Sequence, residues 1–177
     1  MISAIEYAIV NLGSTATLRA STPELDFVPP AAWYDLDNDT AHKSMASRVL
    51  LRSENPTPVF ASNVVIQYFD LGQCDVIRLS EIDTTLDISA LDEAHVLNHA
   101  ADLDGYSCVD DGTYQADGTD LRIRRAQLSY ATASGNSMLS IFTATTTETT
   151  WPTTEPEIKE METRWLRKTT NPTSSAS

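Results

Sequence analysis

Two histidines lie four positions apart in the segment His95-Val96-Leu97-Asn98-His99. On a helix this spacing places both imidazoles on one face, one turn apart, which is how the H-E-x-x-H motif binds zinc. That motif also needs a glutamate as general base, and Val96 occupies its position. The simpler interpretation is a pair of histidines that borders the core, and we expect no bound metal.

The apolar residues around these histidines recur at helical spacing from Asp87 onward and predict a helix over residues 87–104. The residues that carry this period are Ile88, Leu91, Ala94, His95, Leu97 and Ala101. One enzyme hypothesis follows from this helix. It is a hydrolase or metal-dependent enzyme that uses His95 and His99 with a nearby aspartate.

Other clusters of reactive side chains lack the pattern that a known reaction needs. Asp102-Leu103-Asp104 and Asp110-Asp111 are not part of an EF-hand loop, so they are interpreted as solvated acidic loops. Asp117-Gly118-Thr119-Asp120 predicts a turn. Ser134-Gly135-Asn136-Ser137 is not a G-x-S-x-G nucleophile elbow, and no glycine-rich phosphate loop occurs. The sequence therefore predicts no catalytic residue and no cofactor.

Four side chains are candidates for a partner surface: Trp33, Tyr34, Arg122 and Arg124. Trp33 and Tyr34 follow a double proline, and exposed Trp and Tyr are favoured at binding hot spots. Packing at the edge of the fold explains the two aromatic residues equally well. Arg122 and Arg124 share one face of a strand, where they either bind an acidic partner or balance nearby aspartates. Of these two interpretations we favour charge balance.

The chain carries a strong excess of negative charge. It has 177 residues with 25 Asp+Glu against 12 Lys+Arg, which gives a formal net charge of −13. Nucleic-acid binding depends on Lys and Arg that release counterions, so we expect no nucleic-acid partner. Apolar runs such as Val64-Val65-Ile66 are far shorter than the roughly 20 residues of a membrane-spanning helix, so we expect no transmembrane segment.

Residues 1–8 show neither the basic region nor the apolar run of an export signal. As written, the sequence predicts a cytoplasmic protein, whereas a chain from which such a signal had been removed would belong to the cell envelope. Cys74 and Cys108 are expected to remain free, buried thiols, because they form neither a CxxC pair nor a structural zinc pattern.

The chain predicts one domain over residues 1–167 and a disordered tail over 168–177. The expected elements are a helix over 2–10, a hairpin over 15–28, strands over 48–52 and 63–71, the helix over 87–104, strands over 106–115, 121–132 and 138–150, and a closing helix with Ile158, Met161 and Trp165 on its inner face. Short connections between the strands favour antiparallel pairing. The predicted fold class is α+β, with helices packed on an antiparallel sheet.

Several segments resemble the actinobacterial LpqN lipoprotein family. Phe27-Val28-Pro29-Pro30-Ala31-Ala32-Trp33 is similar to the opening of that family, and Phe60-Ala61-Ser62-Asn63-Val64-Val65 is similar to one of its strand starts. Leu103-Asp104-Gly105-Tyr106, the long hairpin over 121–150 and the closing helix follow in the family's order. No lipobox cysteine is present, so the resemblance does not carry membrane anchoring.

The resemblance implies a PsbP-like α/β/α sandwich around a mostly antiparallel sheet. It also implies a non-catalytic binding or accessory protein, because members of the family are mostly of that kind and the LpqN type is associated with the cell envelope. We therefore expect contacts with a protein partner or with an apolar, lipid-like ligand. A chaperone-like partner of a secretion system is a further alternative, beside the enzyme hypothesis.

Overall fold

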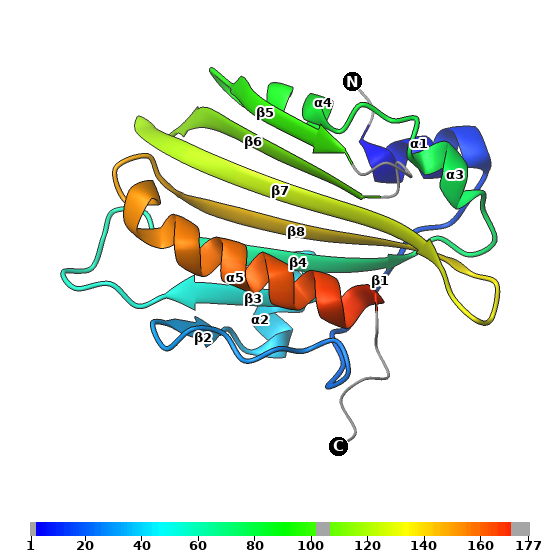
Figure 1. Cartoon of the computed structure of the whole chain (residues 1–177), viewed down its shortest axis with the longest axis horizontal. Coiled ribbons are helices and arrows are strands. Elements are labelled where there is room, and N and C mark those ends of the chain that lie inside the picture. The colour runs from blue at the N-terminus through cyan, green and yellow to red at the C-terminus, as the bar shows by residue number, and fades with distance from the viewer. Residues whose placement is uncertain (1–2, 102–106, 171–177) are drawn as a thin grey trace.

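An antiparallel sheet forms the centre of the protein (Figure 1). The computed structural model describes residues 3–101 and 107–170. The strands are β1 (Thr17–Arg19), β2 (Trp33–Asp35), β3 (Arg48–Arg52), β4 (Asn63–Asp70), β5 (His95–Ala101), β6 (Ser107–Ala116), β7 (Thr119–Ala131) and β8 (Ser137–Thr147). Their order in the sheet is β2-β3-β4-β8-β7-β6-β5, and β1 pairs with the end of β4.

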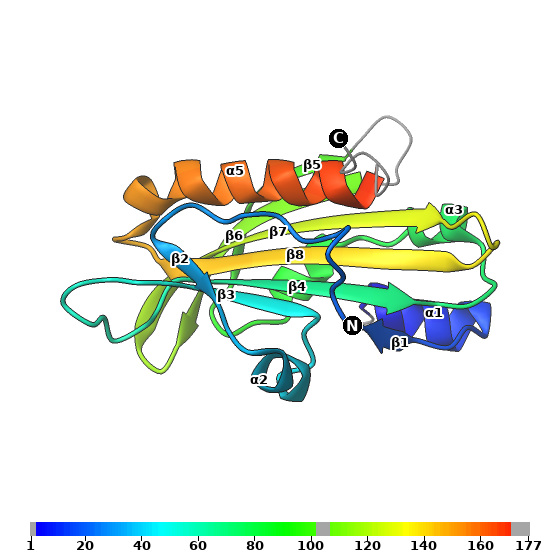
Figure 2. The same cartoon turned by 90° about the horizontal axis from the view of Figure 1, so that it is seen from below.

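Helices cover both faces of this sheet. They are α1 (Ala4–Leu12), α2 (Asn38–Lys43), α3 (Val76–Leu79), α4 (Thr85–Ser89) and α5 (Trp151–Thr170). The long helix α5 lies on one face, and α1 and α2 lie on the opposite face (Figure 2). The predicted α/β/α sandwich with an antiparallel centre is therefore confirmed.

The core under α5 follows from the alternation of side chains along β8. Phe142 and Ala144 point toward α5 and are buried, together with Ile158 and Met161 of the helix. Trp165 completes the contact, with its ring centroid 5.7 Å from that of Phe142. The helical period that predicted this inner face is therefore confirmed.

Helix α5 continues further than the sequence predicts. It ends at Thr170, so the first three residues of the expected tail over 168–177 are helical. Thr169 is buried, and its hydroxyl donates to the carbonyl oxygen of Trp165 at 2.9 Å. Residues 171–177 lie outside the described part of the chain.

The opposite face carries a second core beneath α1. Ser3 caps this helix by a capping box with Glu6, and small buried residues, Ala4 and Ala8, face the sheet. They belong to a cluster with Phe69, Leu71, Leu79, Leu139 and Ile141. Small residues allow the helix to approach the strands closely. Helix α3 contacts α1, and its Leu79 belongs to the same cluster.

The hairpin predicted over 15–28 is wrong. Only Thr17–Arg19 is a strand, and it pairs with β4, far along the chain. Leu25 and Asp26 instead donate their amides to the carbonyl oxygen of Thr22 in a turn. The segment with Trp33 and Tyr34 forms β2 on the other side of that turn. Pairing with β4 stabilises the extended residues better than a local hairpin interrupted by proline.

Candidate functional site

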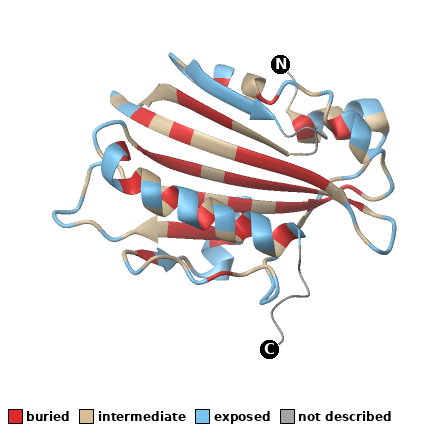
Figure 3. Cartoon of the chain, viewed as in Figure 1, coloured by how far each residue is buried: buried red, intermediate tan, exposed pale blue. Residues whose placement is uncertain are grey.

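The end strand β5 is the most exposed element of the sheet. Among the described residues it pairs with β6 alone, and all seven of its residues are exposed (Figure 3). An edge strand directs one row of backbone N–H and C=O groups away from the sheet, and such a row can pair with another chain. The residues His95–Ala101 therefore form the binding edge considered below.

The helix predicted over 87–104 is wrong, because this binding edge is a strand. The helical part of the segment is α4, which ends at Ser89. Glu93 then adopts a φ of 45°, a left-handed conformation that is incompatible with a continuous helix, in the turn between α4 and β5. Pairing with β6 overrides the helical period of the apolar residues. Residues 102–106 of the predicted helix lie outside the described residues.

The two histidines point to opposite faces of the sheet. His95 lies opposite Thr113 and His99 lies opposite Asp110 in β6. A bulge leaves Leu97 without a partner between them. Since Thr113 and Asp110 are three positions apart in one strand, their side chains face opposite sides, and so do the imidazoles. A site built on both histidines is therefore incompatible with the structure.

His99 is held by a buried carboxylate. Its Nδ1 lies 2.5 Å from Oδ1 of Asp110, whose residue is only 1% exposed. The hydroxyl of Thr84 donates to the other carboxylate oxygen of Asp110 at 2.6 Å. Thr84 precedes α4, so this chain of contacts fixes β5 to β6 and to the helical layer. We call His99, Asp110 and Thr84 the edge clamp.

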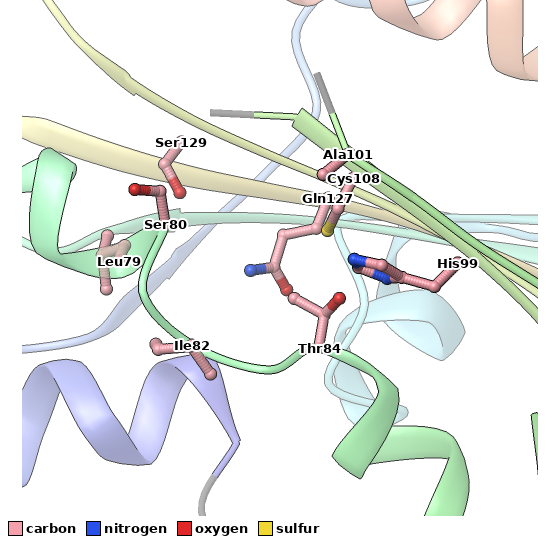
Figure 4. A pocket seen from close by; sticks show the side chains of 9 residues that line it. All are labelled: Leu79, Ser80, Ile82, Thr84, His99, Ala101, Cys108, Gln127 and Ser129. Carbon is pink, nitrogen blue, oxygen red and sulfur yellow. The ribbon is translucent and has the colours of Figure 1, made fainter. Parts of the chain in front are cut away.

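A small cavity lies beside the edge clamp (Figure 4). Its volume is about 60 Å³ and its lining residues are Leu79, Ser80, Ile82, Thr84, His99, Ala101, Cys108, Gln127 and Ser129. Ligand sites commonly measure about 300–1,000 Å³, so this space accommodates a few water molecules rather than a substrate.

Cys108 lines the small cavity but is poorly suited to nucleophilic attack. Burial raises the pKa of the Cys108 thiol, which keeps the sulfur protonated near neutral pH. Cys108 and Cys74 are both unpaired, as the sequence predicts, but each residue is half-buried rather than buried. The geometry of the edge clamp is therefore that of a structural contact between β5, β6 and the residue that precedes α4.

The interpretation of Asp110-Asp111 as a solvated acidic loop is wrong, because both residues are buried within β6. Asp110 belongs to the edge clamp, while Asp111 points to the other face and accepts from Arg124. Asp117 and Gly118 both have positive φ and form the tight turn between β6 and β7, as predicted. In residues 3–101 and 107–170, no group of three or more His, Cys, Asp or Glu is placed to hold a metal ion. Asp102 and Asp104 are outside those ranges.

Trp33 and Tyr34 point to opposite faces of β2. Tyr34 is half exposed, whereas Trp33 is 4% exposed and its Nε1 donates to Oε2 of Glu157 at 2.8 Å. Arg52 donates to the same oxygen at 2.9 Å. Burial favours the neutral form of Glu157, but these two hydrogen bonds outweigh it and lower the pKa of the carboxyl. Trp33 thus packs in the core, and of these two aromatic side chains only Tyr34 is exposed.

Arg122 and Arg124 face α5. Nη1 of Arg124 lies 2.8 Å from Asp111 and its Nε lies 2.5 Å from Glu162. The guanidinium of Arg122 lies 5.0 Å from the ring centroid of Trp151. The ion pairs of Arg124 agree with charge balance, the interpretation favoured from the sequence, whereas the contact of Arg122 is packing on an aromatic ring. The side chains of Arg122 and Arg124 are engaged within the fold.

A polar pocket lies at the start of the binding edge. Its volume is about 280 Å³, and its lining residues are Glu93, His95, Thr113, Tyr114, Gln115, Asp120 and Glu148. The amide of Gln115 donates to one oxygen of Asp120 at 2.9 Å. Neither this acidic pocket nor the binding edge was anticipated from the sequence. Val96 is the only β-branched residue of β5, so the local signal for a strand is weak.

No protein-family model and no curated protein matches the chain. Its structure is similar to the crystal structure of LpqN from Mycobacterium tuberculosis, with a TM-score of 0.71, 15% sequence identity, and coverage of 89% of this chain and 92% of LpqN. The chain has an LpqN-like fold.

The Ran-binding protein Mog1p of Saccharomyces cerevisiae is also similar, with a TM-score of 0.49, 11% identity and coverage of 88% of this chain and 94% of Mog1p. At these identities the similarity concerns the LpqN-like fold and not a shared activity. Of the helices described in this LpqN-like fold, none has the length and apolar character to span a membrane.

Proposed function

We propose that this protein is a non-catalytic binding or accessory module that holds a partner protein at the β5 edge. The observation that carries the proposal is a strand whose seven residues are all exposed at the end of the sheet. The edge clamp supports it, because His99, Asp110 and Thr84 hold β5 in an extended form before any partner arrives.

A role at the cell envelope is part of this proposal. The LpqN structure is described as that of a protein involved in cell envelope biogenesis, and this chain shares its fold. Fractionation of cells that produce the full-length gene product would decide between the envelope and the cytoplasm. Recovery of the protein with the envelope is the result that we expect for the envelope role, and recovery in the cytoplasm alone would contradict it.

A second candidate function is the binding of a lipid-like ligand. An open, mostly apolar hollow of about 370 Å³ lies at the end of β7, and it is lined by Val76, Leu128, Ser129, Tyr130 and Ala131. Its volume falls within the range of small-molecule sites. Displacement of a fluorescent fatty acid from the wild-type protein, with weaker displacement from Tyr130→Ala, would favour this candidate over a protein partner.

The protein-partner proposal is tested by placing charge on the edge. The variant V96K/L97K adds two lysines to exposed positions of β5, and edge lysines oppose pairing with another strand. The control V28K/V59K adds the same charge at two exposed residues outside the sheet. Affinity purification from the source organism should lose its specific partners with V96K/L97K and keep them with V28K/V59K. Equal recovery with both variants would contradict the proposal.

A further inference from the structure

We infer that the β5 edge accepts an extended, basic segment of a partner protein as an additional strand of the sheet. This inference rests on the proposed function and adds the conformation and charge of the partner. It combines two neighbouring features, the exposed backbone of His95–Ala101 and the acidic pocket at the start of that strand.

Apart from the bulge at Leu97, the edge lacks the usual protection against strand addition. No Lys, Arg, Asp or Glu occurs between His95 and Ala101, and the apolar side chains of Val96 and Leu97 are 38% and 52% exposed. The bulge at Leu97 is the one feature of β5 that interrupts regular pairing. An added strand would gain main-chain hydrogen bonds along the edge and apolar contacts with these two side chains.

The charge beside the edge favours a basic partner. Glu93, Asp120 and Glu148 all line the acidic pocket and are exposed. None of the ion pairs found in residues 3–101 and 107–170 involves these three carboxylates. No Lys or Arg lines the pocket. A Lys or Arg from the partner would therefore supply the countercharge that the chain itself does not.

The geometry allows one segment to use both features. Adjacent strands lie about 4.8 Å apart, so a strand added next to β5 would run close to the pocket where β5 begins. Glu93 and His95 belong to the pocket and also stand at the start of the edge. A long basic side chain that projects from the added strand beside His95 can extend over β5 toward Glu93.

A second copy of this chain fits the same edge less well. Pairing of two β5 strands would bring together two molecules that each carry a net charge of −13, and it would leave both acidic pockets without countercharge. Charge complementarity thus selects a basic partner over self-association.

The first experiment uses three synthetic peptides of eight residues and the full chain. One peptide alternates valine with arginine, the second replaces arginine by glutamate, and the third is the basic peptide with every backbone amide methylated. Methylation removes the hydrogen-bond donors of both strand edges and keeps the charge. We expect the basic peptide to shift the amide resonances of β5 and to bind at least about tenfold more tightly than either of the others.

The second experiment separates the pocket from the overall charge. The variant E93Q/D120N/E148Q removes the three pocket carboxylates, and E24Q/D39N/E160Q removes three exposed carboxylates elsewhere. Both change the net charge by the same amount. The pocket variant should lower the affinity for the basic peptide about threefold to tenfold more than the control variant does. This difference in affinity should shrink as salt is added.

The outcomes distinguish this inference from the proposed function. Equal affinity for the basic and acidic peptides at β5, or equal effects of the two triple variants, would overturn the basic partner and leave the binding edge in place. Concentration-dependent dimerisation that V96K/L97K abolishes would assign the edge to a second copy and also overturn the inference. Loss of all β5 responses, together with partner recovery unaffected by V96K/L97K, would overturn the proposed function itself.

Discussion

Ile88 packs so closely on Gly112 that a Cβ at position 112 would lie 2.7 Å from its Cγ2 atom. The same Cβ would lie 2.9 Å from the carbonyl oxygen of His95. Gly112 lies within β6 and Ile88 within α4, so the absence of a side chain at position 112 lets the helix settle on the sheet next to β5. The contact couples the helical layer to the position of the binding edge.

The variant G112A should therefore destabilise the protein. The added methyl group meets Ile88 and backbone at the same time, and overpacking of this kind costs about 1–3 kcal/mol. Urea denaturation measures the loss, and I88A provides the other arm of a double-mutant cycle. In the double variant the clash with Ile88 is removed. The loss of stability in G112A/I88A should therefore be smaller than the sum of the losses in the two single variants. Strict additivity would contradict a direct clash between the two positions.

The contacts of the Asp70 carboxylate lead us to expect that the folded protein loses stability in acid. Its carboxylate accepts from Nη2 of Arg19 at 2.5 Å, from the amide of Gly72 at 2.9 Å and from the side chain of Asn136 at 3.2 Å. These contacts, with the hydrogen bond from Arg19 foremost, lower the pKa of Asp70. Because the folded-state pKa lies below the unfolded value of about 3.9, the stabilisation is present above that pH and is lost as the pH falls through the folded-state pKa.

The measurement compares D70N with wild type by urea denaturation between pH 7 and pH 2.5. Charge-assisted hydrogen bonds contribute about 1–3 kcal/mol, so D70N should be less stable by that amount at pH 7. The difference should shrink below about pH 4. D39N changes an exposed carboxylate in α2 and serves as the control, for which we expect a small difference at pH 7. A D70N deficit that stays constant down to pH 2.5 would contradict this role of the charge.

The sequence predicts those helices and strands in which apolar residues recur at regular spacing within a single segment. The period of Ile158, Met161 and Trp165 identifies the inner face of α5, and the apolar residues of 63–71 identify β4, because each pattern has a single fitting interpretation. The apolar residues of 87–104 also fit a helix, and only pairing with β6 decides against it. That pairing involves residues beyond the local window, as does the contact of Arg124 with Glu162.

The candidate site is harder to predict for the same reason. A strand is an exposed edge when it has a neighbouring strand on one side only. The residues His95–Ala101 do not by themselves reveal which strands pair with them. The acidic pocket joins residues from three separate parts of the chain, Glu93, Asp120 and Glu148. By contrast, the turn at Asp117-Gly118 was predicted from the sequence. A tight turn of this kind needs positive φ at two adjacent positions, and an Asp-Gly pair adopts it readily.

The two histidines should differ sharply in their effect on stability. H99A would leave the buried Asp110 carboxylate with Thr84 as its remaining partner in the edge clamp, at a cost of about 1–3 kcal/mol. H95A changes an exposed residue on the opposite face, and we expect an effect within about 0.5 kcal/mol. Urea denaturation gives the energies, and amide hydrogen exchange should show faster opening of β5 in H99A alone. Equal behaviour of the two variants would argue against the edge clamp.

Cys108 should react slowly with thiol reagents despite its place in a cavity. Burial raises the pKa of its thiol, and only the thiolate attacks a disulfide reagent. In C74S, where Cys108 is the sole cysteine, reaction with Ellman's reagent at pH 7 should be slower in the folded protein than in urea, since a raised pKa lowers the thiolate fraction. The rate should rise with pH only above the ordinary range of a thiol. C108S reports Cys74 separately and serves as the control. A folded C74S that reacts as fast as the unfolded chain would show that Cys108 is an accessible, ionised thiol and would reopen nucleophilic chemistry at this cavity.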